Sequence, residues 1–342
     1  MRPNKKLIAI LSLLLILACQ IPGIPGFATP TPLPTLTTTA SATSSQTATV
    51  TNTATSTETL TPTVTSTPAS LARRVLILSI DGLRPDVNSL APMPNLLNLM
   101  QSSAYTLNAQ TVYPSVTLIS HASMLTGLCP SKHGVDWNDY IPERGYAIGT
   151  DLFDIAHAAG FQTDMFVGKK KLLQLTEPES LDQFVYVNDR ESMIVDQLIA
   201  AFPQDFGVLF IHFPLVDGMG HDYGWLSSQQ LNVAFRADEA FGRLLAELDA
   251  RNLRGETLII VTADHGGHDT SHGSSLPEDM TIPWIASGPS IQPKPLTTTV
   301  HTMDTAATAA FALGLDIPLE WDGVPVYEVF GLPVERQSAQ CP

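Results

Sequence analysis

The chain of 342 residues is poor in charge, in basic residues and in cysteine. Only 15% of the residues are charged, and 18 basic residues against 33 acidic ones give a formal net charge of −15. A protein that binds a nucleic-acid polymer needs a basic face that displaces counterions from the phosphates, so no such partner is expected. Three cysteines are too few for a disulfide scaffold, and the sequence leaves open whether Cys129 and Cys341 pair.

Charge is also nearly absent from the first 70 residues. A basic start, MRPNKK, and an apolar run, LIAILSLLLILA, predict a signal peptide over residues 1–19. The tetrapeptide that ends at Cys19 resembles the lipobox of bacterial lipoproteins, which implies cleavage before Cys19 and lipidation there. Such a lipid would tether the exported protein to a membrane at the cell surface, whereas a plain signal peptide with an incidental cysteine is the alternative.

Residues 20–70 lack the apolar side chains that a core needs. From about residue 28 they are nearly all Thr, Ser, Pro and Ala, with Glu58 as the only charge. Burial in such a segment cannot offset the entropy of ordering it, so the sequence predicts a disordered stalk. We therefore expect one folded domain over residues 71–342.

Within that domain, apolar β-rich runs alternate with segments of helical periodicity. This alternation predicts an α/β fold with a mostly parallel central sheet and helices on both faces. The expected strands are 74–80, 161–167, 206–211, 257–261 and 281–287. The expected helices are 94–100, 117–126, 149–159, 191–202, 227–251 and 302–313.

Three of the buried strands lead into an aspartate, namely Asp81, Asp217 and Asp264. The carboxyl ends of parallel strands meet at one edge of a sheet, where ligands bind. Histidines accompany two of these aspartates, in DGMGH (217–221), predicted to be a tight loop, and in VTADHGGHDTSHG (261–273). A solvated loop is the alternative for the second stretch. Imidazole and carboxylate without thiolate suit Zn²⁺, and also Mn²⁺ or Fe, so the sequence predicts two divalent cations.

Five stretches in this order resemble the alkaline phosphatase superfamily, and most closely its type I phosphodiesterase/nucleotide pyrophosphatase branch. They are LILSIDGLRPD, YPSVTLISHASMLTGLCPSKHG, VDGMGHDYG, VTADHGGH and HGSSLPEDMTIPWIASGP. The resemblance implies that one metal is held by Asp81, Asp264 and His265, with Thr117 bridging to it, and the other by Asp217, His221 and His272. It also implies that Thr117 is the nucleophile and that Asn138 contacts a phosphoryl oxygen. Backbone N–H groups at the start of the helix that begins at Thr117 would face the phosphate.

The activity implied is hydrolysis of a phosphodiester or pyrophosphate bond in a small-molecule phosphate ester, through a phospho-threonine. A phosphomonoesterase or phosphonate hydrolase of the same superfamily is the alternative, and a metal-bound surface module without turnover is a third hypothesis. Nucleotide-cleaving members carry aromatic side chains where this chain has Leu118 and His212. That difference puts a nucleotide substrate in doubt. The segment after Cys129 departs from the sulfatase signature, which argues against a sulfatase.

Several neighbours of the predicted ligands have competing interpretations. Ser115 and Ser120 are rivals of Thr117 as the nucleophile, and the family register favours Thr117. His268 and His301 are rivals of His272 as a ligand. His121 is predicted to be a structural histidine, and the lysine run 169–171 a solvated charge run. The oligomeric state and the natural leaving group do not follow from the sequence.

Overall fold

The structure is a computed structural model, and it describes residues 70–334 and 336–341. The predicted signal peptide, Cys19 and the stalk up to residue 69 lie outside these residues, so they stay predictions. Within the described ranges, no helix combines the length and apolarity that crossing a bilayer requires.

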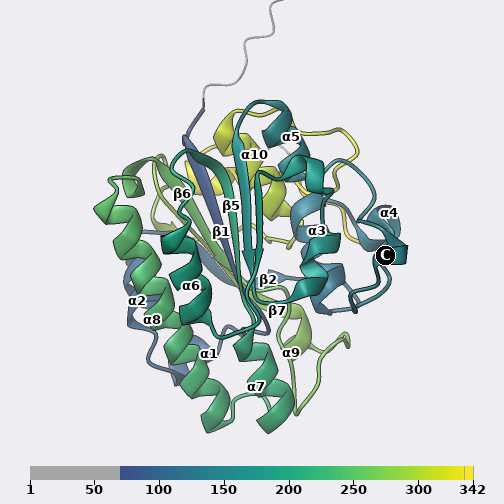
Figure 1. The fold of residues 1–342 in the computed structure, drawn as a ribbon, viewed down its shortest axis with the longest axis vertical. Helices are drawn as coiled ribbons and strands as arrows, with labels where there is room; N and C mark the ends of the chain where they lie inside the picture. The colour runs from purple at the N-terminus through teal and green to yellow at the C-terminus, as the bar shows by residue number, and fades with distance from the viewer. Residues whose placement is uncertain (1–69, 335, 342) are drawn as a thin grey trace, which may run out of the picture. The chain divides into compact units, whose positions relative to one another are not determined.

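A single eight-stranded sheet forms the centre of the domain (Figure 1). The strands are β1 (Arg74–Ile80), β2 (Ala104–Gln110), β3 (Gln162–Val167), β4 (Gln183–Tyr186), β5 (Phe206–Phe213), β6 (Thr257–Thr262), β7 (Thr281–Ser287) and β8 (Lys294–Pro295). Their order is β4-β3-β5-β1-β6-β7-β2-β8. Neighbours are parallel except β6 with β7 and β7 with β2. The predicted mostly parallel α/β architecture is confirmed.

Helices cover both faces of this sheet, α2, α6 and α8 on one side and α3, α5 and α10 on the other (Figure 1). The helices are α1 (Val87–Leu90), α2 (Pro94–Gln101), α3 (Thr117–Thr126), α4 (Pro130–His133), α5 (Leu152–Ala158), α6 (Glu191–Ala200), α7 (Leu215–Tyr223), α8 (Ser228–Ala250), α9 (Pro277–Met280) and α10 (Asp304–Leu313). Short 3₁₀ turns lie at Pro142–Arg144, Lys170–Gln174, Pro178–Ser180, Arg254–Glu256 and Tyr327–Phe330. All six predicted helices are present, within a few residues of their expected ends.

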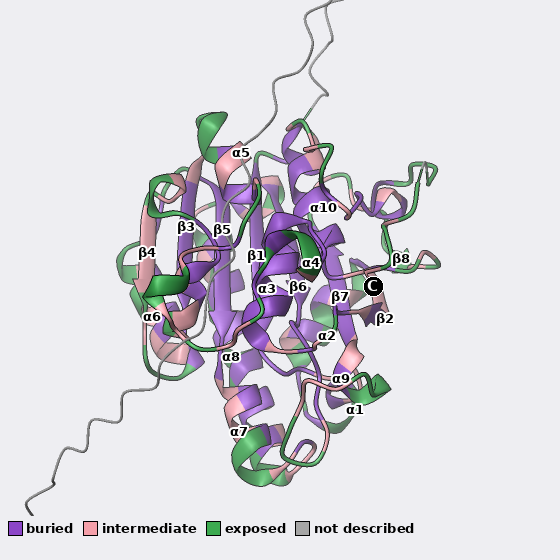
Figure 2. Cartoon of the chain, turned by 90° about the vertical axis from the view of Figure 1, so that its right-hand side faces the viewer, coloured by how far each residue is buried: buried purple, intermediate pink, exposed green. Residues whose placement is uncertain are grey.

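The apolar runs of β1, β5 and β6 form the centre of the core, and every residue of these strands is buried (Figure 2). Strands covered on both faces need apolar side chains at every position, which is why the sequence identified these three. The sequence missed β2, β4 and β8, because β4 is a half-buried edge strand, β2 is largely half-buried and β8 has two residues.

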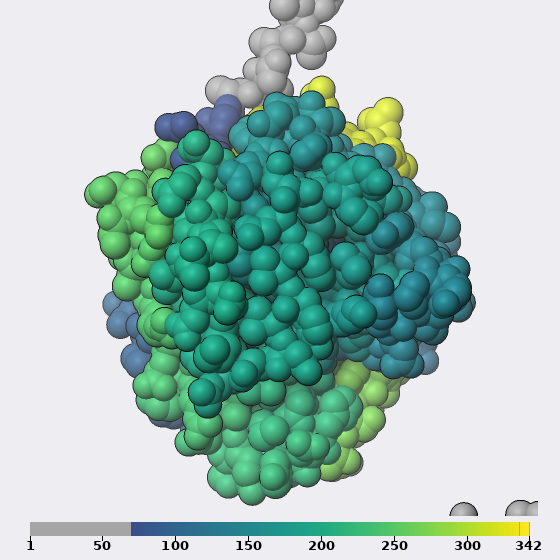
Figure 3. All heavy atoms as spheres, viewed as in Figure 1, coloured from purple at the N-terminus to yellow at the C-terminus, as the bar shows by residue number. Residues whose placement is uncertain are grey.

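The expected tight loop at DGMGH is wrong, because this stretch lies inside α7. A helix places residues four apart on one face, so Asp217 and His221 still lie side by side. Gly220 is needed where α7 meets Trp225, since an added Cβ would come within 2.8 Å of the indole ring. The α7–α8 end of the domain lies beyond the carboxyl ends of β1 and β5, at the lower edge of Figures 1 and 3.

Cys129 and Cys341 form a disulfide across a separation of 212 residues, which answers the question that the sequence left open. The bond joins the loop before α4 to the end of the described chain. It also occupies the sulfur of Cys129, which agrees with the argument against a sulfatase.

Candidate active site

The three predicted aspartates meet at one edge of the sheet. Strands β5, β1 and β6 are consecutive parallel neighbours, so their carboxyl ends lie together. Asp81 directly follows β1, Asp264 comes two residues after β6, and Asp217 lies in the first turn of α7, four residues after β5. Gly82 allows the segment after β1 to approach the start of α7 closely. Its φ is +72°, and an added Cβ would lie 2.9 Å from Cα of Asp217.

Three histidines at this edge are fixed in the same tautomer by the backbone. His221, His265 and His272 each share a hydrogen bond between Nδ1 and a carbonyl oxygen, over 3.0, 2.7 and 2.8 Å. A carbonyl oxygen only accepts, so Nδ1 carries the proton and donates, and Nε2 keeps a lone pair. A backbone partner on the far nitrogen is how proteins orient an imidazole that binds a metal.

The first group consists of Asp81, Asp264 and His265, all fully buried. Oδ1 of Asp81 and Oδ2 of Asp264 are buried and have no hydrogen-bond partner among the described residues. Nε2 of His265 lies 3.5 Å from the first of these oxygens and 3.3 Å from the second. When Asp264 is ionised, three atoms with lone pairs face one another, and a cation would fill the position between them.

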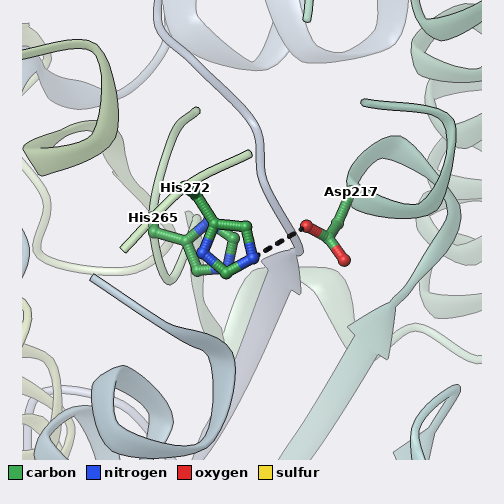
Figure 4. Close-up of side chains that lie close together, drawn as sticks. All are labelled: Asp217, His265 and His272. Carbon is green, nitrogen blue, oxygen red and sulfur yellow. Dashed lines mark ion pairs between the residues drawn. The ribbon is translucent and has the colours of Figure 1, made fainter. Parts of the chain in front are cut away.

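The second group is arranged in the same way around Asp217. Its buried Oδ1 also lacks a partner in the described part of the chain. Nε2 of His221 lies 3.4 Å from this oxygen. Nε2 of His272 lies 3.5 Å from it (Figure 4). The side chain of His221 is 44% exposed, so it lies at the rim of the site. Ligand atoms of Asp217, His265 and His272 all lie within 4.8 Å of one another, and His221 is not part of that cluster. Both groups therefore have the donor set that a divalent cation such as Zn²⁺ accepts.

The charges of the buried groups show why cations suit this position. Burial alone would raise the pKa of Asp81, but the ammonium of Lys169 keeps that pKa well below its usual value. Burial, and then the carboxylate of Asp81, raise the pKa of Asp264 well above its usual value. Burial lowers the pKa of His265, and burial followed by the charge of His265 lowers the pKa of His272 to about 4. Neutral imidazole is the state in which histidine binds a metal, and the raised pKa of Asp264 reflects the burial and carboxylate repulsion that a bound cation would offset.

Thr117 is the first residue of α3 and lies beside the first group. Its Oγ1 is 3.5 Å from Nε2 of His265 and 3.4 Å from Nζ of Lys169, and the residue is only 1% exposed. The rival hydroxyls of Ser115 and Ser120 are hydrogen-bonded to other segments. Of the three hydroxyls, Thr117 is the one whose oxygen lies within 3.5 Å of the Nε2 of a candidate metal ligand.

Asn138 lies next to the start of α3. Its Oδ1 accepts a hydrogen bond from N–H of Leu118 at 3.0 Å and another from Nζ of Lys171 at 2.9 Å. The amide NH₂ group therefore points away from these donors and is available to donate. The N–H of Leu118 is occupied, so the expectation that the amides at this helix start face the phosphate is wrong for Leu118.

The lysine run after β3 is not the solvated charge run that the sequence predicted. Nζ of Lys169 lies 2.7 Å from Oδ2 of Asp81 and 2.6 Å from Oδ2 of Asp217. Of the two neighbouring lysines, only Lys170 is exposed, with its Nζ 4.4 Å from the ring centroid of Tyr140. Lys169 comes two residues after β3, but only the fold shows that β3 is a parallel neighbour of β5 and so ends at the same edge.

Other histidines have partners that keep them out of the two groups. His121 is fully buried and donates from Nδ1 to the carbonyl oxygen of Thr117 at 2.7 Å, so its predicted structural role fits. Nδ1 of His268 lies 2.7 Å from Oδ1 of Asp279. His301 belongs to neither group of candidate ligands within the described residues.

His212 supports the first group, a role that the sequence did not assign to it. The backbone N–H of Gly168 donates to its Nδ1 at 3.3 Å, so the ring proton lies on Nε2. Nε2 donates to Oδ2 of Asp81 at 2.8 Å. This bond uses the oxygen of Asp81 that does not face His265, so it orients the carboxylate for the first group.

Comparison with known proteins shows the family of the chain. A family model described as type I phosphodiesterase/nucleotide pyrophosphatase matches residues 75–284. The chain is 28% identical to venom phosphodiesterase CdcPDE of Crotalus durissus collilineatus over 229 residues, which cover 60% of this chain and 27% of that protein. It is 25% identical to human ectonucleotide pyrophosphatase/phosphodiesterase family member 5 over 218 residues, 57% of this chain and 45% of that protein. The chain thus spans less than half the length of these relatives.

Among solved structures, an inactive variant of murine ectonucleotide pyrophosphatase/phosphodiesterase 5 in complex with AMP has the same fold. The TM-score is 0.64 at 16% identity, and the match covers 75% of this chain and 98% of that one.

Proposed function

The chain belongs to the type I phosphodiesterase/nucleotide pyrophosphatase family, and we propose that it hydrolyses phosphodiester or pyrophosphate bonds in small molecules through a covalent intermediate on Thr117. The observation that carries this proposal is the pair of donor groups, each with unpartnered carboxylate oxygens facing imidazole lone pairs, beside one hydroxyl.

Asp81, Asp264 and His265 would hold one cation, and Asp217, His221 and His272 the other. Bound divalent cations would supply the positive charge that lowers the pKa of a hydroxyl and neutralises phosphoryl oxygens. Because the chain has a formal net charge of −15, such a source of positive charge would favour binding of an anionic substrate.

The residues of the chain then have distinct tasks in the reaction. Oγ1 of Thr117 attacks phosphorus, the bond to the leaving oxygen breaks, and the phosphoryl group stays on Thr117. Asn138 donates from its amide to a non-bridging oxygen, while its Oδ1 is anchored by Leu118 and Lys171. Water then cleaves the phospho-threonine and restores the hydroxyl.

The experiment that tests this function compares two chromogenic esters. We expect release of p-nitrophenolate from bis-p-nitrophenyl phosphate to exceed release from p-nitrophenyl phosphate. Equal or faster cleavage of the monoester would favour the phosphomonoesterase alternative. Absence of turnover of either ester by protein that holds two metals would favour the non-catalytic module.

We also propose that the protein is exported and anchored by lipid on Cys19. The lipobox-like tetrapeptide supports this, and the Cys129–Cys341 disulfide fits an oxidising compartment. In cells fed labelled palmitate, the wild-type chain should carry label in the membrane fraction and Cys19→Ser should not. Equal labelling of both proteins would reject the anchor.

A further inference from the structure

A pocket lies where the start of α6, the start of α7 and one face of α8 meet, away from the residues used in the reaction described above. The helices α6 and α8 that form two of its sides lie next to each other in Figure 1. The cavity has a volume of about 450 Å³, which is enough for a small organic molecule.

This pocket is separate from the candidate active site. Its lining includes Leu215, the first residue of α7, but none of the candidate metal ligands. Residues two apart on a helix point about 200° away from each other, so Leu215 and Asp217 lie on opposite sides of α7. A molecule in the pocket would therefore contact α7 from the side that faces away from the candidate metal positions.

The inner wall of the pocket is apolar. Val233 and Ala240 are buried residues of α8, and their spacing of seven residues places them on one face of the helix. The half-buried side chain of Leu215 lines the same cavity. Such a wall favours a ligand with an apolar body, since contact removes apolar surface from water.

Arginines lie at the mouth of the pocket, and two of them have free charges. Arg190, Arg236 and Arg243 are exposed, and Arg243 forms an ion pair with Asp196. The guanidinium groups of Arg190 and Arg236 have neither a hydrogen bond nor an ion pair within the described ranges, whereas every other arginine there has at least one. A guanidinium group binds a carboxylate through two parallel hydrogen bonds.

The acidic residues of the lining do not cancel this charge. Glu191 is buried and accepts a hydrogen bond from N–H of Leu215 at 2.9 Å, and burial raises its pKa. Glu239 is exposed, so one solvated carboxylate stands against two free guanidinium groups. The start of α6, which carries the positive end of the helix dipole, adds to the excess. An excess of about one charge suits a singly charged anion.

We propose that this pocket binds a small organic carboxylate with an apolar body. The carboxylate lies between Arg190 and Arg236, and the apolar part lies on Leu215, Val233 and Ala240. This second site goes beyond the proposed function and does not depend on it.

Calorimetry on the full chain with its metals tests the site, with 2-naphthoate, the uncharged 2-naphthamide and acetate as probes. We expect 2-naphthoate to bind about tenfold more tightly than 2-naphthamide, as one hydrogen bond between charged groups gives. Acetate should bind more weakly than 2-naphthoate because it lacks the apolar body. Arg236→Met should remove most of the preference for the charged probe, and the double variant with Arg190→Met should remove all of it.

Arg73→Met is the matched control, because Arg73 is exposed, lies outside the pocket and loses the same charge. It should leave the preference unchanged. Equal binding of 2-naphthoate and 2-naphthamide, or acetate bound as tightly as 2-naphthoate, overturns the proposal. A preference that survives the double substitution also overturns it, since the carboxylate then binds the metals instead. Absence of ester turnover with an intact, arginine-dependent preference would reject the proposed function alone.

Discussion

The imidazole of His272 stacks on that of His265, with ring centroids 3.8 Å apart and an interplanar angle of 14° (Figure 4). The two rings belong to different predicted metal groups, so the two candidate metal sites are in direct contact. Each ring donates Nδ1–H to the backbone and turns Nε2 toward an aspartate of its own group. A substitution in one group should therefore also affect the metal affinity of the other group.

Replacing His272 by alanine should lower the metal content from two to one per chain, because Asp217 would keep only His221 as an imidazole partner. His268→Ala is the control. His268 lies six residues after the end of β6 and contacts Asp279 instead, so its loss should leave two metals bound. Inductively coupled plasma mass spectrometry gives the ratio. Equal metal loss in both variants would contradict the assignment of His272.

Thr117→Ala should lower kcat for bis-p-nitrophenyl phosphate by about 10⁴-fold or more, as removal of a covalent nucleophile does. The metal content should not fall, because both groups of aspartates and histidines remain. In the wild-type protein, acid quench during turnover of bis-p-nitrophenyl phosphate should trap a p-nitrophenylphosphoryl group on the peptide that contains Thr117. The same adduct on Ser115 or Ser120 instead would transfer the role to that residue.

Asn138→Ala should lower kcat by about 10²-fold, because one neutral donor to the transition state is lost. The effect on KM should be smaller, since the donor acts most strongly where charge develops. Steady-state kinetics separate the two constants. A change confined to KM would mean that Asn138 only binds the ground state.

Glu328 provides a pH-dependent contribution to stability away from the active site. Burial would raise its pKa, but the amide and hydroxyl groups of Thr298 and Thr297 donate to the carboxylate and lower the pKa to about 2. Because the pKa of Glu328 is lower in the folded chain, its carboxylate stabilises the fold at pH values above 4.5, the pKa in the unfolded chain. This stabilisation is lost as the pH falls toward 2. Urea unfolding should show Glu328→Gln less stable by about 1–2 kcal/mol at pH 7.

The difference between Glu328→Gln and the wild-type chain should shrink steadily from pH 5 to pH 3. Thr302→Val, at a buried hydroxyl that lacks a partner within the described ranges, is a control that carries no titratable group. Its effect should not change with pH. A constant difference for Glu328→Gln across the same range would show that the charge of this carboxylate does not matter.

The parts of the site that follow strands could be predicted from the sequence. Asp81, Asp217 and Asp264 are recognisable because each follows a run of apolar residues that only a buried strand explains. The helix at Asp217 was missed because two glycines in five residues favour a loop, and packing against Trp225 outweighs that preference.

Other features depend on contacts between distant segments, which local patterns do not encode. Lys169 is part of an ordinary charge run until the neighbouring β5 and β1 bring two carboxylates to its ammonium group. The tautomers of the histidines depend on carbonyl groups up to 157 residues away. The pairing of Cys129 with Cys341 likewise required the fold.

Anomalous diffraction from crystals grown with the metal that the purified chain retains tests the central claim most directly. The account predicts two peaks, one in contact with Asp81, Asp264 and His265 and the other with Asp217, His221 and His272, and Oγ1 of Thr117 next to the first. A single peak, or peaks away from these side chains, would contradict it.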